Sequence, residues 1–176
     1  MKPNNIVPFL LFIVSIIIFN TSFAQELAIK EGTYVLNEIT YKVDSLNIYD
    51  RCVIYRNQRP QLKPNRSIVD GLPLDYIDLE LTNYDVLVNK VRTLLGKTKC
   101  DALSRAGERI LFTFIFDPNG RIIDITFAIN ANGILTLLDI AVLDKDLRES
   151  YTGTFKSDFN GHKHLYWIHY NCYIRF

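Results

Sequence analysis

The sequence is poor in the residues that build metal and redox sites. Its 176 residues include three cysteines and three histidines, and no Cys-x-x-Cys pair occurs. Structural zinc sites and dithiol redox sites commonly use such pairs, so neither is indicated. No serine lies in a Gly-x-Ser-x-Gly motif, and no Gly-rich phosphate loop is present. We therefore expect a non-catalytic protein without a cofactor.

The chain also has little net charge. Twenty lysines and arginines face 19 aspartates and glutamates, and Lys2 is the only charged residue before Glu26. Loss of the first 24 residues would leave 19 charges of each sign. No basic block or acidic tail is present. Nucleic acid and anionic membrane surfaces are therefore disfavoured as partners.

The apolar run at the N-terminus is too short for a typical membrane span. It covers residues 6–19, whereas a spanning helix needs about 20 apolar residues. Lys2 precedes the run, and Ser22-Phe23-Ala24 places small residues three and one positions before a cut after Ala24. We predict a signal peptide over residues 1–24 and a periplasmic or secreted mature chain with no stable membrane insertion. An uncleaved anchor is the alternative.

Export permits a disulfide among Cys52, Cys100 and Cys172, although their spacing does not select a pair. Because three is odd, the simplest interpretation is one bridge and one buried thiol. Cys172 lies on the apolar face of the last predicted strand, which makes it the candidate for the free thiol.

The N-terminal part of the mature chain, residues 25–73, is predicted to hold strands and a loop. Apolar residues alternate over residues 33–43, which indicates one half-buried strand, and residues 52–55 indicate a second. Residues 56–73 contain three prolines and Gly71, as a surface loop would. We expect a β-hairpin extension here, and the sequence leaves open whether it joins the main sheet.

The remaining domain, residues 74–176, is predicted to be α+β. An apolar stripe at helical spacing predicts a helix from Tyr84 to Leu95, with Thr82 and Asp85 as a capping box. The turn at residues 117–120 predicts a hairpin of strands 109–116 and 121–129. A second helix over residues 136–149 and a long strand over 165–176 follow. We expect a small antiparallel sheet packed against two helices.

Five local motifs in this order resemble the C-terminal domain of TonB-like proteins. They are Ala106-Gly107-Glu108, Phe116-Asp117-Pro118-Asn119-Gly120-Arg121-Ile122, Leu138-Asp139-Ile140-Ala141, Phe155-Lys156 with Asn160-Gly161, and Ile174-Arg175-Phe176. The resemblance covers residues 83–176 and lacks the family's membrane anchor and Pro-rich linker. Ser157 also stands where the family usually has proline. The resemblance implies a TonB C-terminal-like module that binds a peptide at a sheet edge, without force transmission.

The mixed face of the last strand carries the candidate binding residues, Trp167, His169, Tyr173 and Arg175. Trp, Tyr and Arg are enriched at protein-binding hot spots, and an edge strand can pair with an extended peptide. We therefore predict a protein or peptide partner from the envelope or the secreted fraction. The alternative is an aromatic strand covered by the N-terminal hairpin.

The sequence leaves two other functions open, a metal-dependent enzyme and an exported inhibitor. His162 and His164 are weak candidates for metal ligands of an enzyme, because residues two positions apart in an extended segment lie on the same side. An exported inhibitor or immunity-type protein would instead use the loop over residues 56–73. The acidic residues of the second helix, Asp139, Asp144, Asp146 and Glu149, are interpreted as its solvated face rather than as acid–base groups.

Overall fold

The computed structural model describes residues 28–46, 50–62 and 79–176. The predicted signal peptide, its cleavage after Ala24 and most of the predicted loop over residues 56–73 lie outside the described residues. The strands are β1 Gly32–Leu36, β2 Ile39–Leu46, β3 Arg51–Arg56, β4 Leu79–Leu81, β5 Arg109–Phe116, β6 Ile122–Asn130, β7 Phe155–Ser157 and β8 Ile168–Arg175. The helices are α2 Tyr84–Leu95, α3 Lys97–Ala106, α4 Leu137–Ser150 and the 3-10 helix η2 Asp158–His164. Within the described ranges, no helix combines the length and the apolar character that a bilayer span requires.

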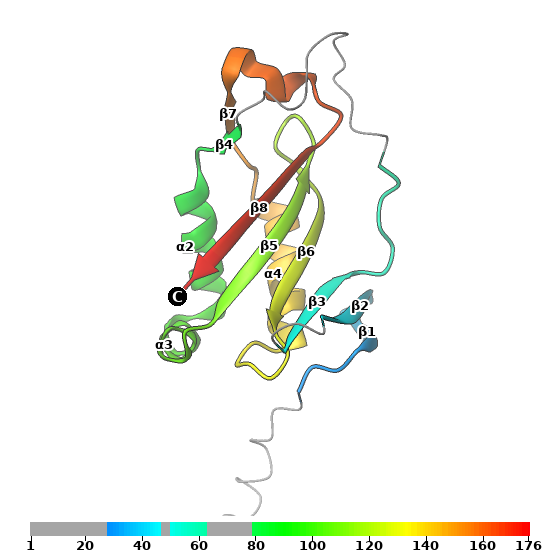
Figure 1. Ribbon diagram of the computed structural model, residues 1–176, viewed down its shortest axis with the longest axis vertical. Helices are drawn as coiled ribbons and strands as arrows, with labels where there is room; N and C mark the ends of the chain where they lie inside the picture. Colours follow the sequence, from blue (N-terminus) through cyan, green and yellow to red (C-terminus); the bar gives the residue numbers. More distant parts are fainter. Residues whose placement is uncertain (1–27, 47–49, 63–78) are drawn as a thin grey trace, which may run out of the picture.

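Six strands form one antiparallel sheet in the order β1-β2-β3-β6-β5-β8. The N-terminal strands join this sheet because β3 pairs with β6 over five residue pairs. Helices α2 and α4 lie behind the sheet in Figure 1, α3 lies at its lower end, and β4 pairs with β7 at the other end. The predicted α+β class, with an antiparallel sheet and N-terminal strands, is confirmed.

The prediction of one strand over residues 33–43 is wrong, because a tight turn divides this segment into β1 and β2. Asn37 and Glu38 form the turn with φ angles of 49° and 67°, as a mirrored two-residue hairpin turn requires. The side-chain parity reverses across the turn. Tyr41 therefore faces the core and is 1% exposed, whereas Val35 is 68% exposed.

The helix at residues 84–95 is confirmed, but its predicted capping box is wrong. Asn83 is the N-cap residue and makes no side-chain cap bond. Its amide instead fixes the segment after α4, since Oδ1 accepts from the Thr154 N–H at 2.9 Å and Nδ2 donates to the Thr152 carbonyl at 2.8 Å. Gly96 ends the helix with φ 77°, and a further helix, α3, follows at once. Sequence analysis missed α3 because Leu103 is its one buried residue, so no apolar stripe marks it.

The hairpin of β5 and β6 supplies the centre of the core. Its strands lie where the alternation placed them, and the Asp117 carboxylate accepts from the N–H groups of Asn119 and Arg121 in the turn. Phenylalanines on the helix-facing side are almost fully buried and pack on α2 and α4. Helix α4 begins with a capping box formed by Thr136 and Asp139.

Candidate functional site

The second face of the six-stranded sheet is not covered by α2 or α4 (Figure 1). We call this surface the open face, and the strand register arranges its side chains in rows across β3, β6, β5 and β8. The first row is Arg51, Asn130, Arg109 and Arg175; the second is Val53, Ala128, Leu111 and Tyr173; the third is Tyr55, Thr126, Thr113 and Asn171. The first row is therefore basic, the second mostly apolar and the third polar.

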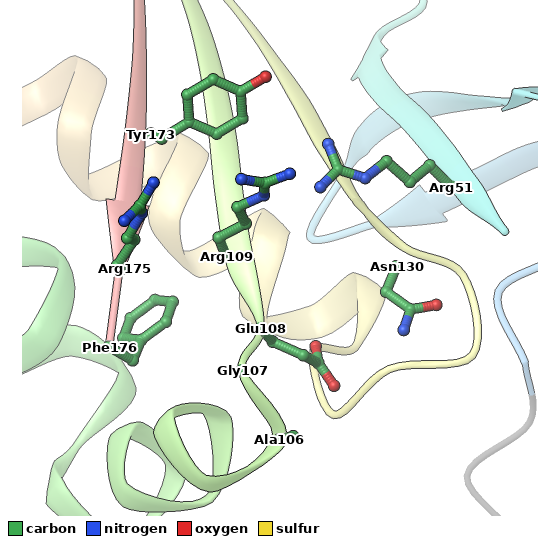
Figure 2. A pocket seen from close by; sticks show the side chains of 9 residues that line it. All are labelled: Arg51, Ala106, Gly107, Glu108, Arg109, Asn130, Tyr173, Arg175 and Phe176. Atoms are coloured by element: carbon green, nitrogen blue, oxygen red, sulfur yellow. The ribbon is translucent and has the colours of Figure 1, made fainter. Parts of the chain in front are cut away.

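A cavity of about 800 Å³ lies at the first row, and we call it the basic hollow. Its lining residues are Arg51, Ala106, Gly107, Glu108, Arg109, Asn130, Tyr173, Arg175 and Phe176. Figure 2 shows the side chains of Arg51 and Arg109 extending toward one another from β3 and β5. The guanidinium carbon of Arg109 lies 5.0 Å from the centre of the Tyr173 ring, a cation–π contact.

The arginines of the basic hollow form no ion pair with the described residues around them. In the described part of the chain, no carboxylate lies within ion-pair distance of Arg51, Arg109 or Arg175. Glu108 also lines the hollow, but its side chain is directed toward the loop after Asn130 (Figure 2). There its Oε1 accepts a hydrogen bond from the Ile134 N–H at 3.0 Å. Three guanidinium groups are therefore left facing solvent, which favours an anionic ligand.

The structure brings together two of the four predicted binding residues. Tyr173 and Arg175 lie on the open face at the hollow, and Tyr173 is 45% exposed. His169 lies on the same face toward the other end of β8, opposite Ile115. Trp167 precedes β8 and is half-buried.

Sequence analysis missed Arg51 and Arg109 as candidate site residues. They are 58 positions apart in the chain, and only the pairing of β3 with β6 and of β6 with β5 brings them to one surface. Arg109 opens a strand whose alternation was recognised, so its outward direction could have been read from the parity. The neighbourhood of Arg51 could not be read in this way, because no local pattern specifies which strands pair.

The edge of the sheet at β8 is partly closed by side chains of α2. The Tyr84 hydroxyl donates to the Tyr173 carbonyl at 2.6 Å, and Nη2 of Arg92 donates to the Arg175 carbonyl at 3.1 Å. An incoming strand at this position would have to compete with both bonds. Side chains that satisfy edge groups are one way in which proteins suppress unwanted strand pairing.

The histidine motif is not arranged as sequence analysis expected. His162 and His164 lie in the 3-10 helix η2, where residues two apart point in different directions rather than to one side. His162 is buried, and its Nδ1 lies 2.7 Å from Oγ of Ser157. Burial lowers the pKa of the imidazole, and the neighbouring Lys163 and His164 lower it further. The described residues contain no group of three His, Cys, Asp or Glu side chains that could hold a metal ion.

The expected disulfide is not formed, since all three cysteines are free. Cys52 on β3 and Cys172 on β8 are separated by two intervening strands, and strands lie about 4.8 Å apart, so these residues are far beyond disulfide reach. Burial raises the pKa of the Cys52 thiol to about 11 and that of the Cys172 thiol to about 12. Cys172 is the buried free thiol that the strand pattern predicted.

One acidic residue of α4 was placed wrongly on the solvated face. Asp144 is 1% exposed and accepts hydrogen bonds from the Tyr41 hydroxyl, Arg56 and Arg148. Arg148 also bonds Asp124, another buried carboxylate. Every buried carboxylate in this cluster is ion-paired, and the pairs join β3, β6 and α4.

These elements define an α+β protein with helices on one face of an antiparallel sheet. No family model and no curated protein matches the chain. The crystal structure of a DUF5043 family protein from Bacteroides uniformis is similar in fold, with a TM-score of 0.62 and 14% sequence identity over 84% of this chain and 86% of that chain. The likeness shows the fold alone, and the resemblance to TonB-like domains stays a prediction.

Proposed function

We propose that this chain is a non-catalytic binding domain that takes a protein or peptide partner on the open face of its sheet. The observation that carries the proposal is the exposed group of Tyr173, Arg109 and Arg175 beside a hollow. Tyrosine and arginine contribute strongly to binding energy when a partner excludes water from them. The predicted export of the chain would make the partner an envelope or secreted protein.

The face is favoured over the edge as the binding surface. At the edge, the carbonyl groups of Tyr173 and Arg175 already accept hydrogen bonds from α2. A peptide pairing with β8 along its whole length would lose these bonds before gaining its own. A partner lying on the open face displaces water and leaves both bonds intact.

The proposal is tested by capturing the partner with the full chain, exported with its own leader and tagged after Glu26 so that β8 is unmodified. Captured proteins are compared by mass spectrometry for wild type, Tyr173→Ala and Leu138→Ala. Leu138 lies on α4, in the helical layer, and is 58% exposed. Leu138→Ala therefore also removes an exposed side chain, but from the helical layer instead of the open face. We expect one partner that Tyr173→Ala loses and Leu138→Ala retains. A partner lost equally in both variants, or retained in both, contradicts binding at this face.

A further inference from the structure

We infer that the basic hollow binds an acidic segment of the partner, with carboxylates at alternate positions of an extended peptide. This inference rests on the proposed function and adds the chemistry of the ligand. Three observations carry it: the unpaired arginines of the first row on the open face, the spacing of the residues in that row, and the near-zero net charge of the chain.

The unpaired arginines of the first row contrast with the arginines that buried carboxylates hold elsewhere in the fold. Arg56, Arg59 and Arg148 each form an ion pair with a buried carboxylate at 3.0 Å or less. Arg109 and Arg175 instead lie directly opposite one another in the pairing of β5 with β8. Like charges in that position destabilise a sheet. A bound anion would reduce the repulsion, and among the described residues no carboxylate forms an ion pair with either arginine.

The spacing of the row matches a peptide with two carboxylates. Strands lie about 4.8 Å apart, so Arg51 and Arg109 are about 10 Å apart at the backbone with Asn130 between them. One carboxylate fits between the guanidinium groups of Arg51 and Arg109, which extend toward one another in Figure 2, and a second fits between Arg109 and Arg175, about 7 Å away. In an extended peptide, side chains on one side recur at about 6.8 Å. A segment of the form acidic-x-acidic lying across the strands therefore matches both positions.

A peptide fits the hollow better than a long polyanion. The chain carries 20 basic and 19 acidic residues, so it lacks the general excess of positive charge that nucleic acid binding requires. The row beside the arginines is mostly apolar, with Val53, Leu111 and the half-exposed Tyr173, and can accept apolar side chains that flank the acidic residues. Small anions such as phosphate share the carboxylate's chemistry and are distinguished by experiment.

The test is a titration followed by NMR of the ¹⁵N-labelled chain, recovered after export. The probe is the peptide Ala-Val-Glu-Val-Glu-Val-Ala with both ends blocked, beside a Gln-for-Glu analogue and one with Glu-Val-Val-Glu spacing. We expect shift changes at Arg51, Arg109, Asn130 and Tyr173, and binding at least about tenfold weaker for the Gln analogue. Arg51→Ala and Arg109→Ala should each weaken binding about tenfold or more, while Arg121→Ala, at the exposed hairpin turn, should change it less than about twofold.

Several results overturn the inference. Equal binding of the Gln analogue shows that carboxylates are not recognised, and equal binding of the longer-spaced peptide contradicts the alternate positions. Binding of inorganic phosphate at the hollow without binding of any peptide assigns the site to a small anion.

Two further measurements separate the possible failures. Arg109→Thr should melt near the wild-type temperature, since removing the like-charge pair offsets the loss of the cation–π contact with Tyr173, so lost binding in that variant cannot be attributed to unfolding. If Tyr173→Ala loses the captured partner and Arg51→Ala and Arg109→Ala retain it, the proposed function stands and the acidic ligand is wrong. If the peptide binds but no captured partner depends on Tyr173, the proposed function fails on its own test.

Discussion

The hydroxyl of Tyr41 on β2 donates a 2.9 Å hydrogen bond to the buried carboxylate of Asp144 on α4. Nε of Arg56, on β3, reaches the same oxygen at 2.6 Å, and Arg148 reaches the other oxygen at 2.7 Å. Two of the N-terminal strands are therefore attached to the last long helix by side chains as well as by β-pairing. Burial is the largest cause that raises the pKa of the Tyr41 hydroxyl. The negative charge of Asp144 and the hydrogen bond to it raise this pKa further.

Asp144→Asn should lower the free energy of unfolding by about 3 kcal/mol, because it leaves two guanidinium groups beside a neutral amide. Unfolding in urea, followed by circular dichroism, measures the change. Asp146→Asn on the same helix is the matched control: Asp146 is 35% exposed and pairs with Lys90, so its loss should cost less than about 1 kcal/mol. Equal costs for the two variants would contradict the importance of the buried cluster.

Gly120→Ala should cost at least about 2 kcal/mol in stability, since a Cβ there would lie 1.8 Å from the Gly153 carbonyl oxygen and the backbone has φ 82°. Gly107→Ala is the control, with a similar φ of 66° and no atom within 4 Å of the added carbon. It should cost about 1 kcal/mol, the penalty of the left-handed conformation alone. Melting temperatures measure the difference, and two equal losses would show that the contact between the hairpin turn and Gly153 has no energetic consequence.

Local pattern predicted the parts of the fold whose contacts repeat at a fixed period. The alternation from Ile110 to Phe116 and the helical stripe from Tyr84 to Leu95 both have their buried side chains where the period placed them. The turn at Asn37 and Glu38 was missed because both residues adopt positive φ without glycine. Helix α3 was missed because it has one buried side chain.

The basic hollow could be predicted only in part. The strand period placed Tyr173 and Arg175 on one face of the last strand, and the structure agrees. It could not place Arg51 beside them, since that depends on β3 pairing with β6 rather than with another strand. The burial of Asp144 has the same origin, because its guanidinium partner Arg56 comes from β3, 88 residues away.

Stability should fall as the pH is lowered through the ordinary titration range of histidine, and His162 should account for part of the fall. Burial lowers the pKa of its imidazole in the folded chain. The unfolded chain, with a histidine pKa of about 6.5, therefore takes up the proton first. The stabilisation is complete above the unfolded pKa and is lost as the pH falls toward the lower folded pKa.

His162→Asn removes the titrating group while keeping an amide near the position of Nδ1, which lies beside Ser157. The free energy of unfolding, measured in urea from pH 7.5 to pH 5, should decline less steeply in this variant than in wild type, whatever its absolute stability. His169→Gln, at an exposed position on the open face, is measured over the same pH range as the control for loss of a histidine. If His162→Asn keeps the wild-type slope while another histidine variant flattens it, the pH dependence arises elsewhere than in the buried imidazole.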